Sequence, residues 1–160
     1  MIATFFQVFP NGAIFSNDEH YEGYDAVLMG QAEPSKIDVD NLQGLLDRSE
    51  YFAVKESLAE VGFGNGGAGQ QYMDRGPVLE LFATFAGQAS DLQEWTKNAQ
   101  INHDRDLRLQ YLAGMYFNSY LSTKILQSIL SHYKFPANLF AGSEDRLGML
   151  KQALMESGRR

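Results

Sequence analysis

The stretch GAIFSNDEHYEGYDAVLMG, residues 12–30, decides how the first part of the chain folds. It contains two short apolar runs, residues 13–15 and 26–29, separated by a polar segment that includes a glycine. Short apolar runs bounded by polar and turn residues are typical of strands, so the stretch predicts an antiparallel β-hairpin with a long, exposed connection. Because neither run alternates with polar residues, we expect both faces of the hairpin to be covered.

The segments next to the hairpin indicate that it does not stand alone. Residues 2–8 have the pattern of a short helix. The sequence Phe-Pro-Asn-Gly at 9–12 is typical of a turn and predicts the end of that helix. An isolated two-stranded hairpin is marginally stable in water. The hairpin is therefore interpreted as the edge of a larger sheet.

From Pro34 onward the periodicity predicts helices, so the expected fold class is mainly α with a small β part. An N-terminal antiparallel β-hairpin, residues 1–31, would be followed by an irregular helical bundle, residues 32–160. The predicted helices and their caps are residues 36–48 (Asp38 or Asp40), 50–61, 76–87, 90–100 (Ser90 or Asp91, with Glu94 in a capping box), 106–133 (broken near Asn118-Ser119) and 143–157 (Ser143, with Leu147, Leu150 and Leu154 facing inward).

The glycine-rich segment EVGFGNGGAGQQY, residues 60–72, contains the spacing G-x-G-x-x-G at Gly62, Gly64 and Gly67. In a dinucleotide site, a buried strand precedes these glycines and a helix follows them. Here the preceding apolar residues recur every three or four positions, which is a helical pattern. We interpret the segment as a flexible loop between helices, with Gly62 ending the first of them.

Composition excludes several classes of protein. The chain has 160 residues, no cysteine and a formal net charge of -7, so a surface that neutralises nucleic-acid phosphates is not expected. No apolar run approaches the roughly 18 residues of a membrane helix. The first residues lack the basic flank of a signal peptide. These features favour a cytoplasmic protein with no nucleic-acid partner and no direct membrane insertion.

Two polar clusters were weighed as catalytic or metal sites. Residues 103–106, His-Asp-Arg-Asp, could form a metal or acid–base cluster, or a polar turn that opens the long helix at Asp106. The second interpretation is favoured, because adjacent side chains rarely converge on one ion. The acidic segment 18–25 could bind a cation, but a solvated loop is commoner and calcium-loop spacing is absent. From the residues alone we expect no catalytic, cofactor-binding or metal-binding residue and no cofactor.

Two stretches of the chain resemble bacterial spermidine synthase-like proteins. Residues 5–10 match the turn pattern F-x-x-V-F-P, and residues 25–30 match the strand pattern D-x-x-L-x-G. Further on, NHDRDLRLQY at 102–111 is similar to the family segment N-T-D-D-x-P-x-x-E-Y. Asn102, Asp104 and Tyr111 fit that segment, which makes them candidates on the substrate side; departures from it are at His103, Arg105, Leu107 and Gln110.

The resemblance covers most of residues 4–117 and implies a place in polyamine biosynthesis. Family members transfer an aminopropyl group from decarboxylated S-adenosylmethionine to putrescine, and in many of them this domain follows a membrane half. The hairpin would be the end of a methyltransferase-like sheet. The family's donor-binding glycine loop and catalytic aspartates lie upstream and are absent from these 160 residues. The resemblance therefore implies a C-terminal region that is inactive alone, on the cytoplasmic side of a membrane if fused, and partnered by the upstream catalytic domain.

Two other functions were kept as alternatives. One is a helical protein-interaction or dimerisation module, which the aromatic-rich helix near residues 115–133 would suit. The other is an independent small enzyme, although no nucleophile and base are visible together. Because the hairpin edge needs a partner, we expect a homodimer with the hairpin at or near its interface.

Overall fold

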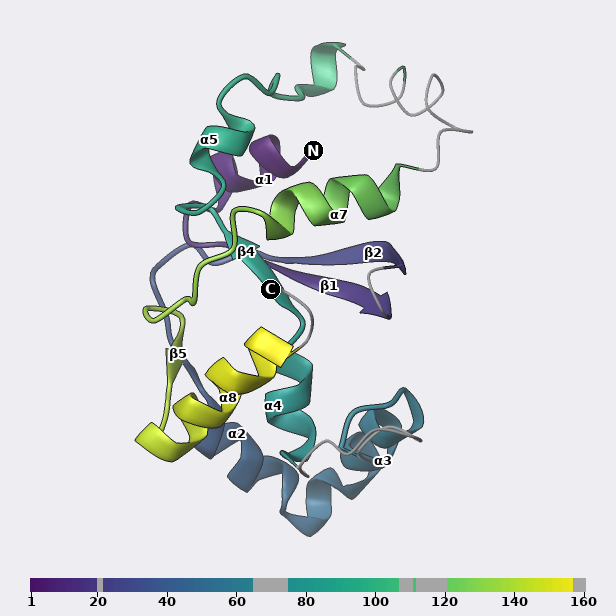
Figure 1. The fold of residues 1–160 in the computed structure, drawn as a ribbon, viewed down its shortest axis with the longest axis vertical. Coiled ribbons are helices and arrows are strands. Elements are labelled where there is room, and N and C mark those ends of the chain that lie inside the picture. The colour runs from purple at the N-terminus through teal and green to yellow at the C-terminus, as the bar shows by residue number, and fades with distance from the viewer. Residues whose placement is uncertain (20–21, 65–74, 107–110, 112–120, 157–160) are drawn as a thin grey trace. The chain divides into compact units, whose positions relative to one another are not determined.

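The computed structural model describes residues 1–19, 22–64, 75–106, 111 and 121–156 of the chain (Figure 1). Two compact units are present. Unit 1 combines Met1–Pro34 with Phe85–Lys134, and unit 2 combines Ser35–Thr84 with Phe135–Arg160. This division differs from the predicted parts 1–31 and 32–160, since residues 85–134 group with the hairpin. Each unit is described by itself.

Unit 1 contains a three-stranded antiparallel sheet with the order β2-β1-β4. Strand β1, Ala13–Glu19, pairs with β2, Glu22–Met29, in the register Ala13↔Met29. The predicted hairpin is confirmed, but the prediction of a long connection is wrong. The two strands extend through most of the polar segment. This is possible because the backbone hydrogen bonds between antiparallel strands form regardless of whether the side chains are polar.

The third strand was not expected. Helix α4, Gly76–Phe82, ends early, and β4, Phe85–Gln88, pairs with β1 in the register Ala13↔Gln88. The predicted helix 76–87 is therefore wrong in its second half. The free edge of β1 offers backbone donors and acceptors to residues 85–88, and this tertiary pairing overrides a local pattern that is compatible with a helix.

Among its described residues, unit 1 contains the helices α1, Ile2–Val8, α5, Gln93–Thr96, and α7, Ser122–Leu130, with a short 3-10 turn, η2, at Asp104–Asp106. Helix α1 has the predicted bounds. Helix α5 is much shorter than the predicted helix 90–100 and begins at Leu92 without a side-chain cap. Ser90 bonds to the neighbouring Asp91 instead, at 3.4 Å. The predicted break near Asn118 lies outside the described residues.

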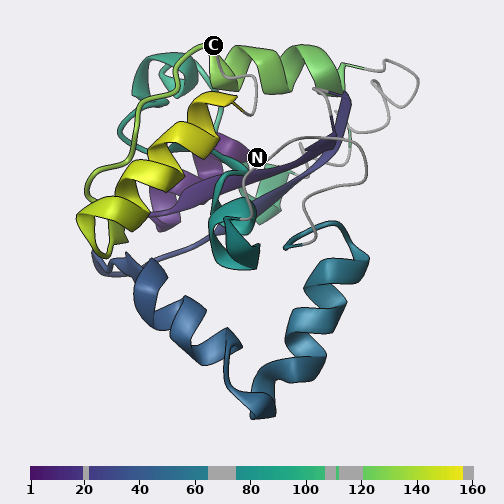
Figure 2. The same cartoon turned by 60° about the horizontal axis from the view of Figure 1, so that its bottom comes forward.

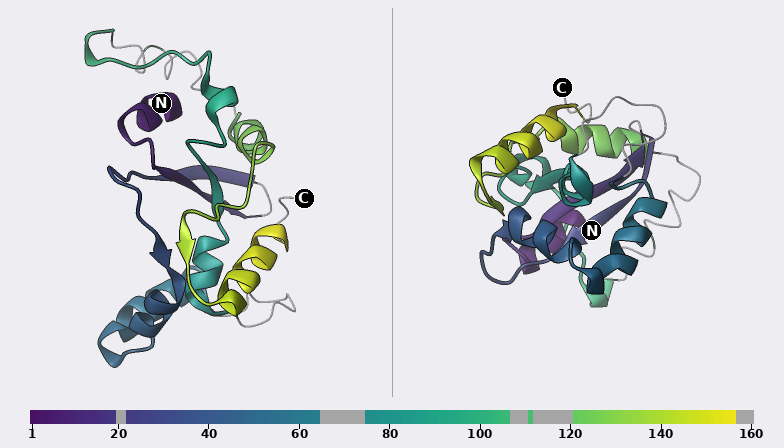
Figure 3. Two further views of the ribbon diagram at one scale, coloured as in Figure 1. Left: turned by 90° about the vertical axis from the view of Figure 1, so that its left-hand side faces the viewer. Right: turned by 90° about the horizontal axis from the view of Figure 1, so that it is seen from below.

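The core of unit 1 surrounds β1 on both faces. Ile14 packs with Ala86, Leu92 and Ile129 on one face, which α7 covers (Figures 1 and 3). On the other, the ring of Phe85 lies 5.9 Å from that of Phe15 and 6.0 Å from that of Tyr133. Burial on both faces is thus confirmed for β1. It is wrong for β2: Leu28 packs against the core cluster on one face, but Val27 on the other face is 58% exposed.

The described part of unit 2 consists mainly of helices and contains two strands of two residues each. Its elements are β3, Ile37–Asp38, α2, Val39–Leu46, the 3-10 turn η1, Ser49–Tyr51, α3, Phe52–Glu60, α4, β5, Phe140–Ala141, and α8, Glu144–Glu156. Strands β3 and β5 pair in parallel, and Figure 2 shows α2 and α3 diverging from η1.

Local chemistry fixes the ends of these helices. Asp38 caps α2, because its carboxylate accepts a 2.9 Å hydrogen bond from the backbone of Asn41. Gly62, at φ +97°, follows the end of α3, as predicted. Ser143 directly precedes α8, its carbonyl accepts a hydrogen bond from the backbone of Leu147, and its hydroxyl donates to Asp40.

The predicted fold class, mainly α with a small β part, is confirmed. Leu150 and Leu154 of α8 are buried, as expected from their spacing, and Leu147 is partly buried. Within the described part of the chain, none of the helices has the length and apolar character that crossing a bilayer requires.

Candidate functional site

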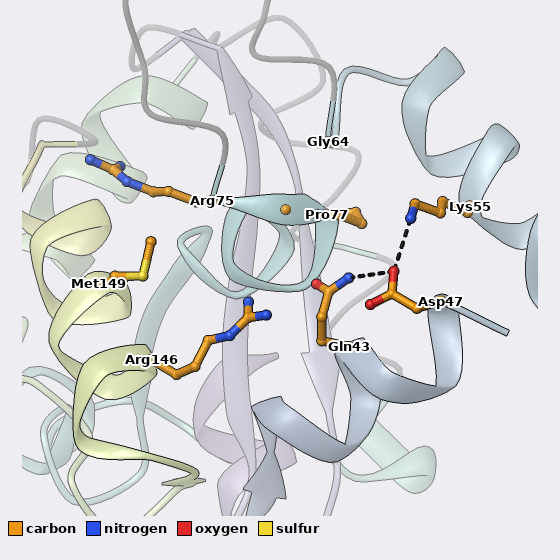
Figure 4. A pocket seen from close by; sticks show the side chains of 9 residues that line it. Gln43, Asp47, Lys55, Gly64, Arg75, Pro77, Arg146 and Met149 are labelled. Carbon is orange, nitrogen blue, oxygen red and sulfur yellow. Dashed lines mark hydrogen bonds and ion pairs between the residues drawn. The ribbon is translucent and has the colours of Figure 1, made fainter.

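A polar cavity of about 440 Å³ lies within unit 2 (Figure 4). Four helices contribute to it: α2 supplies Gln43, α3 supplies Lys55, α4 begins beside it, and α8 supplies Arg146. The residues that line the cavity are Gln43, Asp47, Lys55, Gly64, Arg75, Gly76, Pro77, Arg146 and Met149.

Asp47 organises one wall of this cavity. Its Oδ1 accepts hydrogen bonds from Lys55 Nζ at 2.9 Å and from Gln43 Nε2 at 3.1 Å. The hydrogen bond from Lys55, followed by that from Gln43, lowers the pKa of Asp47, and the charges of Lys55 and Arg146 act in the same direction. Asp47 is therefore a carboxylate near neutral pH and holds both donors in place.

The side-chain oxygen of Gln43 is an acceptor without a donor. Because a carboxylate only accepts hydrogen bonds, the contact with Asp47 identifies the Gln43 nitrogen and leaves Oε1 on the other side of the amide. Gln43 is only 7% exposed, and Oε1 has no hydrogen-bond partner among the described residues. Leaving such a buried group unsatisfied costs about 1–3 kcal/mol.

A glycine makes room beside this oxygen. A Cβ atom placed on Gly76 would lie 2.9 Å from Gln43 Oε1. Gly76 also has φ +76°, a conformation that side chains other than glycine rarely adopt. Glycine at this position therefore allows the backbone of α4 to lie close against Gln43, where a side chain would collide with Oε1.

The cations at the cavity are neutralised to different extents. Arg75 is 8% exposed and forms an ion pair with Glu156, and Lys55 pairs with Asp47. Among the described residues, the ion-pair contact of Arg146 is a long one, 3.6 Å from its Nε to Asp40 Oδ1. In Figure 4 the Arg75 side chain runs away from Gln43, whereas Arg146 reaches from α8 toward it.

Asp40 is itself engaged by other groups. Ser143 donates to it twice, from its backbone nitrogen to Oδ2 and from its hydroxyl to Oδ1 at 3.3 Å. The carboxylate beside Arg146 is therefore shared, and within the described part of the chain Arg146 has the longest ion-pair contact of the three cations at the cavity. The arrangement suits binding of an anion. It contains no nucleophile with an adjacent base, and the described residues contain no group of ligands for a metal ion.

The candidates from the sequence lie in unit 1, whereas all residues of the cavity lie in unit 2. The backbone nitrogen of Asn102 donates a 2.9 Å hydrogen bond to Thr4 Oγ1. Asp104 begins the turn η2, and Tyr111 is 70% exposed. The structure thus joins the backbone of Asn102 to the N-terminal helix, while the side chain of Asp104 lies outside the described part of the chain.

The residues of the cavity were missed because their convergence is tertiary. Gln43 and Asp47 are one turn apart on a helix that the sequence does predict, and this spacing was the one available signal. Arg146 lies about a hundred positions further along the chain, and no local pattern indicates that it lines the same cavity.

Comparison with known proteins leaves the family open. No match was found to a protein-family model, to a curated protein sequence or to a solved structure.

Proposed function

We propose that this chain is the C-terminal region of a spermidine synthase-like aminopropyltransferase and is catalytically silent by itself. The observation that carries the proposal is the hydrogen bond from Asn102 to Thr4. It joins Thr4, directly before the stretch 5–10, to Asn102, the first residue of the stretch 102–111, within one compact unit although 98 positions separate them. A segment that contacts substrate needs such a fixed position beside the catalytic sheet.

The charge of the chain is compatible with this role. A formal net charge of -7 favours the approach of a cationic amine such as putrescine. Asp104 would attract one ammonium group and Tyr111 would offer its hydroxyl to the other, while the donor site and the catalytic carboxylate belong to the upstream domain. The proposed location is the cytoplasm, or the cytoplasmic side of the membrane in a fused protein.

The 160-residue chain should form no spermidine above a control without protein, because it lacks a donor-binding loop and a catalytic carboxylate. A longer protein that includes the upstream domain should form it. In that protein, Asp104→Asn should lower kcat/KM for putrescine about ten-fold or more, since a charge-assisted hydrogen bond is lost. Chromatography with mass detection of spermidine measures both results.

Asp106→Asn is the matched control, because Asp106 lies in the same turn at the variable position of the family segment. Its kcat/KM should stay within about two-fold of the original value. Spermidine formation by the 160-residue chain would contradict the proposal, as would equal losses for the two variants.

The free sheet edge favours a second candidate, a dimerisation module. Strand β2 pairs only with β1 among the described strands, and Ala26 and Val27 on it are exposed. An exposed edge offers unpaired backbone groups to another strand, and a second copy can pair with it through a two-fold axis. According to this second proposal, the chain forms a dimer through β2 and has no catalytic activity.

Light scattering at micromolar concentration should give the mass of a homodimer. Val27→Lys should shift it to the monomer mass, because a charge at the centre of the edge opposes pairing. Val54→Lys on α3, which is also exposed, should leave the dimer intact. A monomer mass for the unsubstituted chain, together with slow amide exchange in the hairpin, would show that the same chain covers the edge of β2 without a second copy. That result would contradict the dimerisation proposal.

A further inference from the structure

We propose that Asp91 is a pH-sensitive switch in unit 1: with its carboxyl group protonated, strand β4 is held firmly on β1, and ionisation of that group loosens the junction. The proposal concerns the turn of residues 88–91, which leads from β4 toward α5 (Figure 1). It is independent of the aminopropyltransferase proposal, since it requires neither a substrate nor an upstream domain.

The backbone of Asp91 connects it to the core of unit 1. Its nitrogen donates a 3.0 Å hydrogen bond to the carbonyl of Gln88, the last residue of β4, and the nitrogen of Leu92 donates to the same carbonyl at 3.2 Å. Leu92 is fully buried and packs with Ile14 and Ala86. A movement that brings the Asp91 side chain into water therefore disturbs the turn that places Leu92 against β1 and β4.

The carboxyl group of Asp91 is poorly placed to carry a negative charge. Its side chain is partly buried, and Oδ2 is inaccessible to water and has no hydrogen-bond partner among the described residues. The hydroxyl of Ser90 reaches only the other oxygen, Oδ1, at 3.4 Å. A charged oxygen that is removed from water without a donor favours the protonated form of the acid.

Burial raises the pKa of Asp91, and it outweighs the groups that favour ionisation, which are Lys134 by its charge and Gln88 and Ser90 by hydrogen bonds. A carboxyl group whose pKa is raised by folding stabilises the folded state below its unfolded pKa. That contribution is lost as the pH rises through the folded pKa. The junction of β4 with β1 should therefore be tightest in acid and loosest near neutral pH.

The other charged groups around this turn do not replace the effect of Asp91. Residues 13–15 of β1, which pair with β4, carry no charge. On α5 and just after it, Glu94 and Lys97 form an ion pair at 2.6 Å. Among the described residues, the remaining titratable side chains on α7 and directly after it are Lys124, His132 and Lys134.

An NMR titration of the side-chain carboxyl carbons of the full chain, from pH 3 to pH 7, tests the first step. Asp91 should titrate at a pH above the ordinary aspartate value of about 3.9, because burial opposes its ionisation. A midpoint at or below that value would overturn the proposal, since the fold would then favour the ionised form.

Amide hydrogen exchange of β4 tests the second step. At pH 7 the opening constant of the β4 amides, corrected for the intrinsic exchange rate, should be at least about two-fold smaller in Asp91→Asn than in the original chain, because asparagine has a similar shape and no charge. At pH 4 the two proteins should differ less, since protonation removes the charge from the original chain as well.

Asp25→Asn is the matched control, because it removes one negative charge from an exposed position of the same sheet. It should leave the opening constant of β4 like that of the original chain at both pH values. Equal effects of the two variants would show a response to net charge and contradict the proposal, as would an unchanged opening constant in Asp91→Asn at pH 7. If Asp91→Asn does not fold, the original chain decides: an opening constant of β4 that does not increase from pH 4 to pH 7 contradicts the switch.

Discussion

Replacing Ile14 with alanine should lower the free energy of unfolding by about 2–5 kcal/mol. Ile14 is fully buried and belongs to the cluster formed with Ala86, Leu92 and Ile129, so three missing carbon atoms leave a cavity between β1, β4 and α7. The loss should be this large only if β4 packs beside β1, because a hairpin with an open side would let water fill the gap. Urea unfolding followed by circular dichroism measures it.

Val27→Ala is the matched control, since Val27 lies on the same hairpin but is 58% exposed. Its free energy of unfolding should change by no more than about 0.5 kcal/mol. Similar effects of the two substitutions would mean that both residues have similar surroundings, which contradicts the order β2-β1-β4.

Replacing Glu156 with glutamine should lower the free energy of unfolding by about 1–3 kcal/mol. Glu156 is the carboxylate partner of Arg75, whose side chain is 8% exposed and cannot recover water when its counterion is removed. The expected loss stays below that of a fully buried pair, because 29% of the Glu156 side chain is exposed. Urea unfolding of unit 2, followed through an amide probe in α4, measures the change.

Glu60→Gln removes a carboxylate from an exposed position of α3 in the same unit. It should change the free energy of unfolding by less than about 0.5 kcal/mol. If Glu156→Gln has an effect as small as that of this control, the ion pair with Arg75 does not contribute measurably to stability. The packing of α4 on α8 would then have another cause.

Local signals in the sequence were sufficient where a single segment decides its own structure. Proline and glycine end α1 within four residues, Asp38 caps α2 through a contact three residues away, and Gly62 ends α3 with a positive φ. The hairpin also follows from adjacent segments. In each case the deciding interaction spans a few positions of the chain.

Structure that depends on distant partners was not predictable in the same way. Residues 85–88 become a strand because β1, some seventy positions earlier, offers them a free edge. The cavity brings together Gln43 and Arg146 from distant parts of the chain, and the sequence offered only the one-turn spacing of Gln43 and Asp47 as a signal. Asn102 was singled out by resemblance alone, and its contact with Thr4 emerged only from the fold.

The natural length of the polypeptide tests the proposed function most directly. Sequencing the transcript upstream of the Met1 codon, together with the intact mass of the natural protein, should reveal a continuous frame for a longer chain. That frame should encode a glycine-rich strand-loop-helix, a following acidic residue and catalytic aspartates. A natural protein with the mass of the 160 residues, and no such segment upstream, would contradict the aminopropyltransferase proposal.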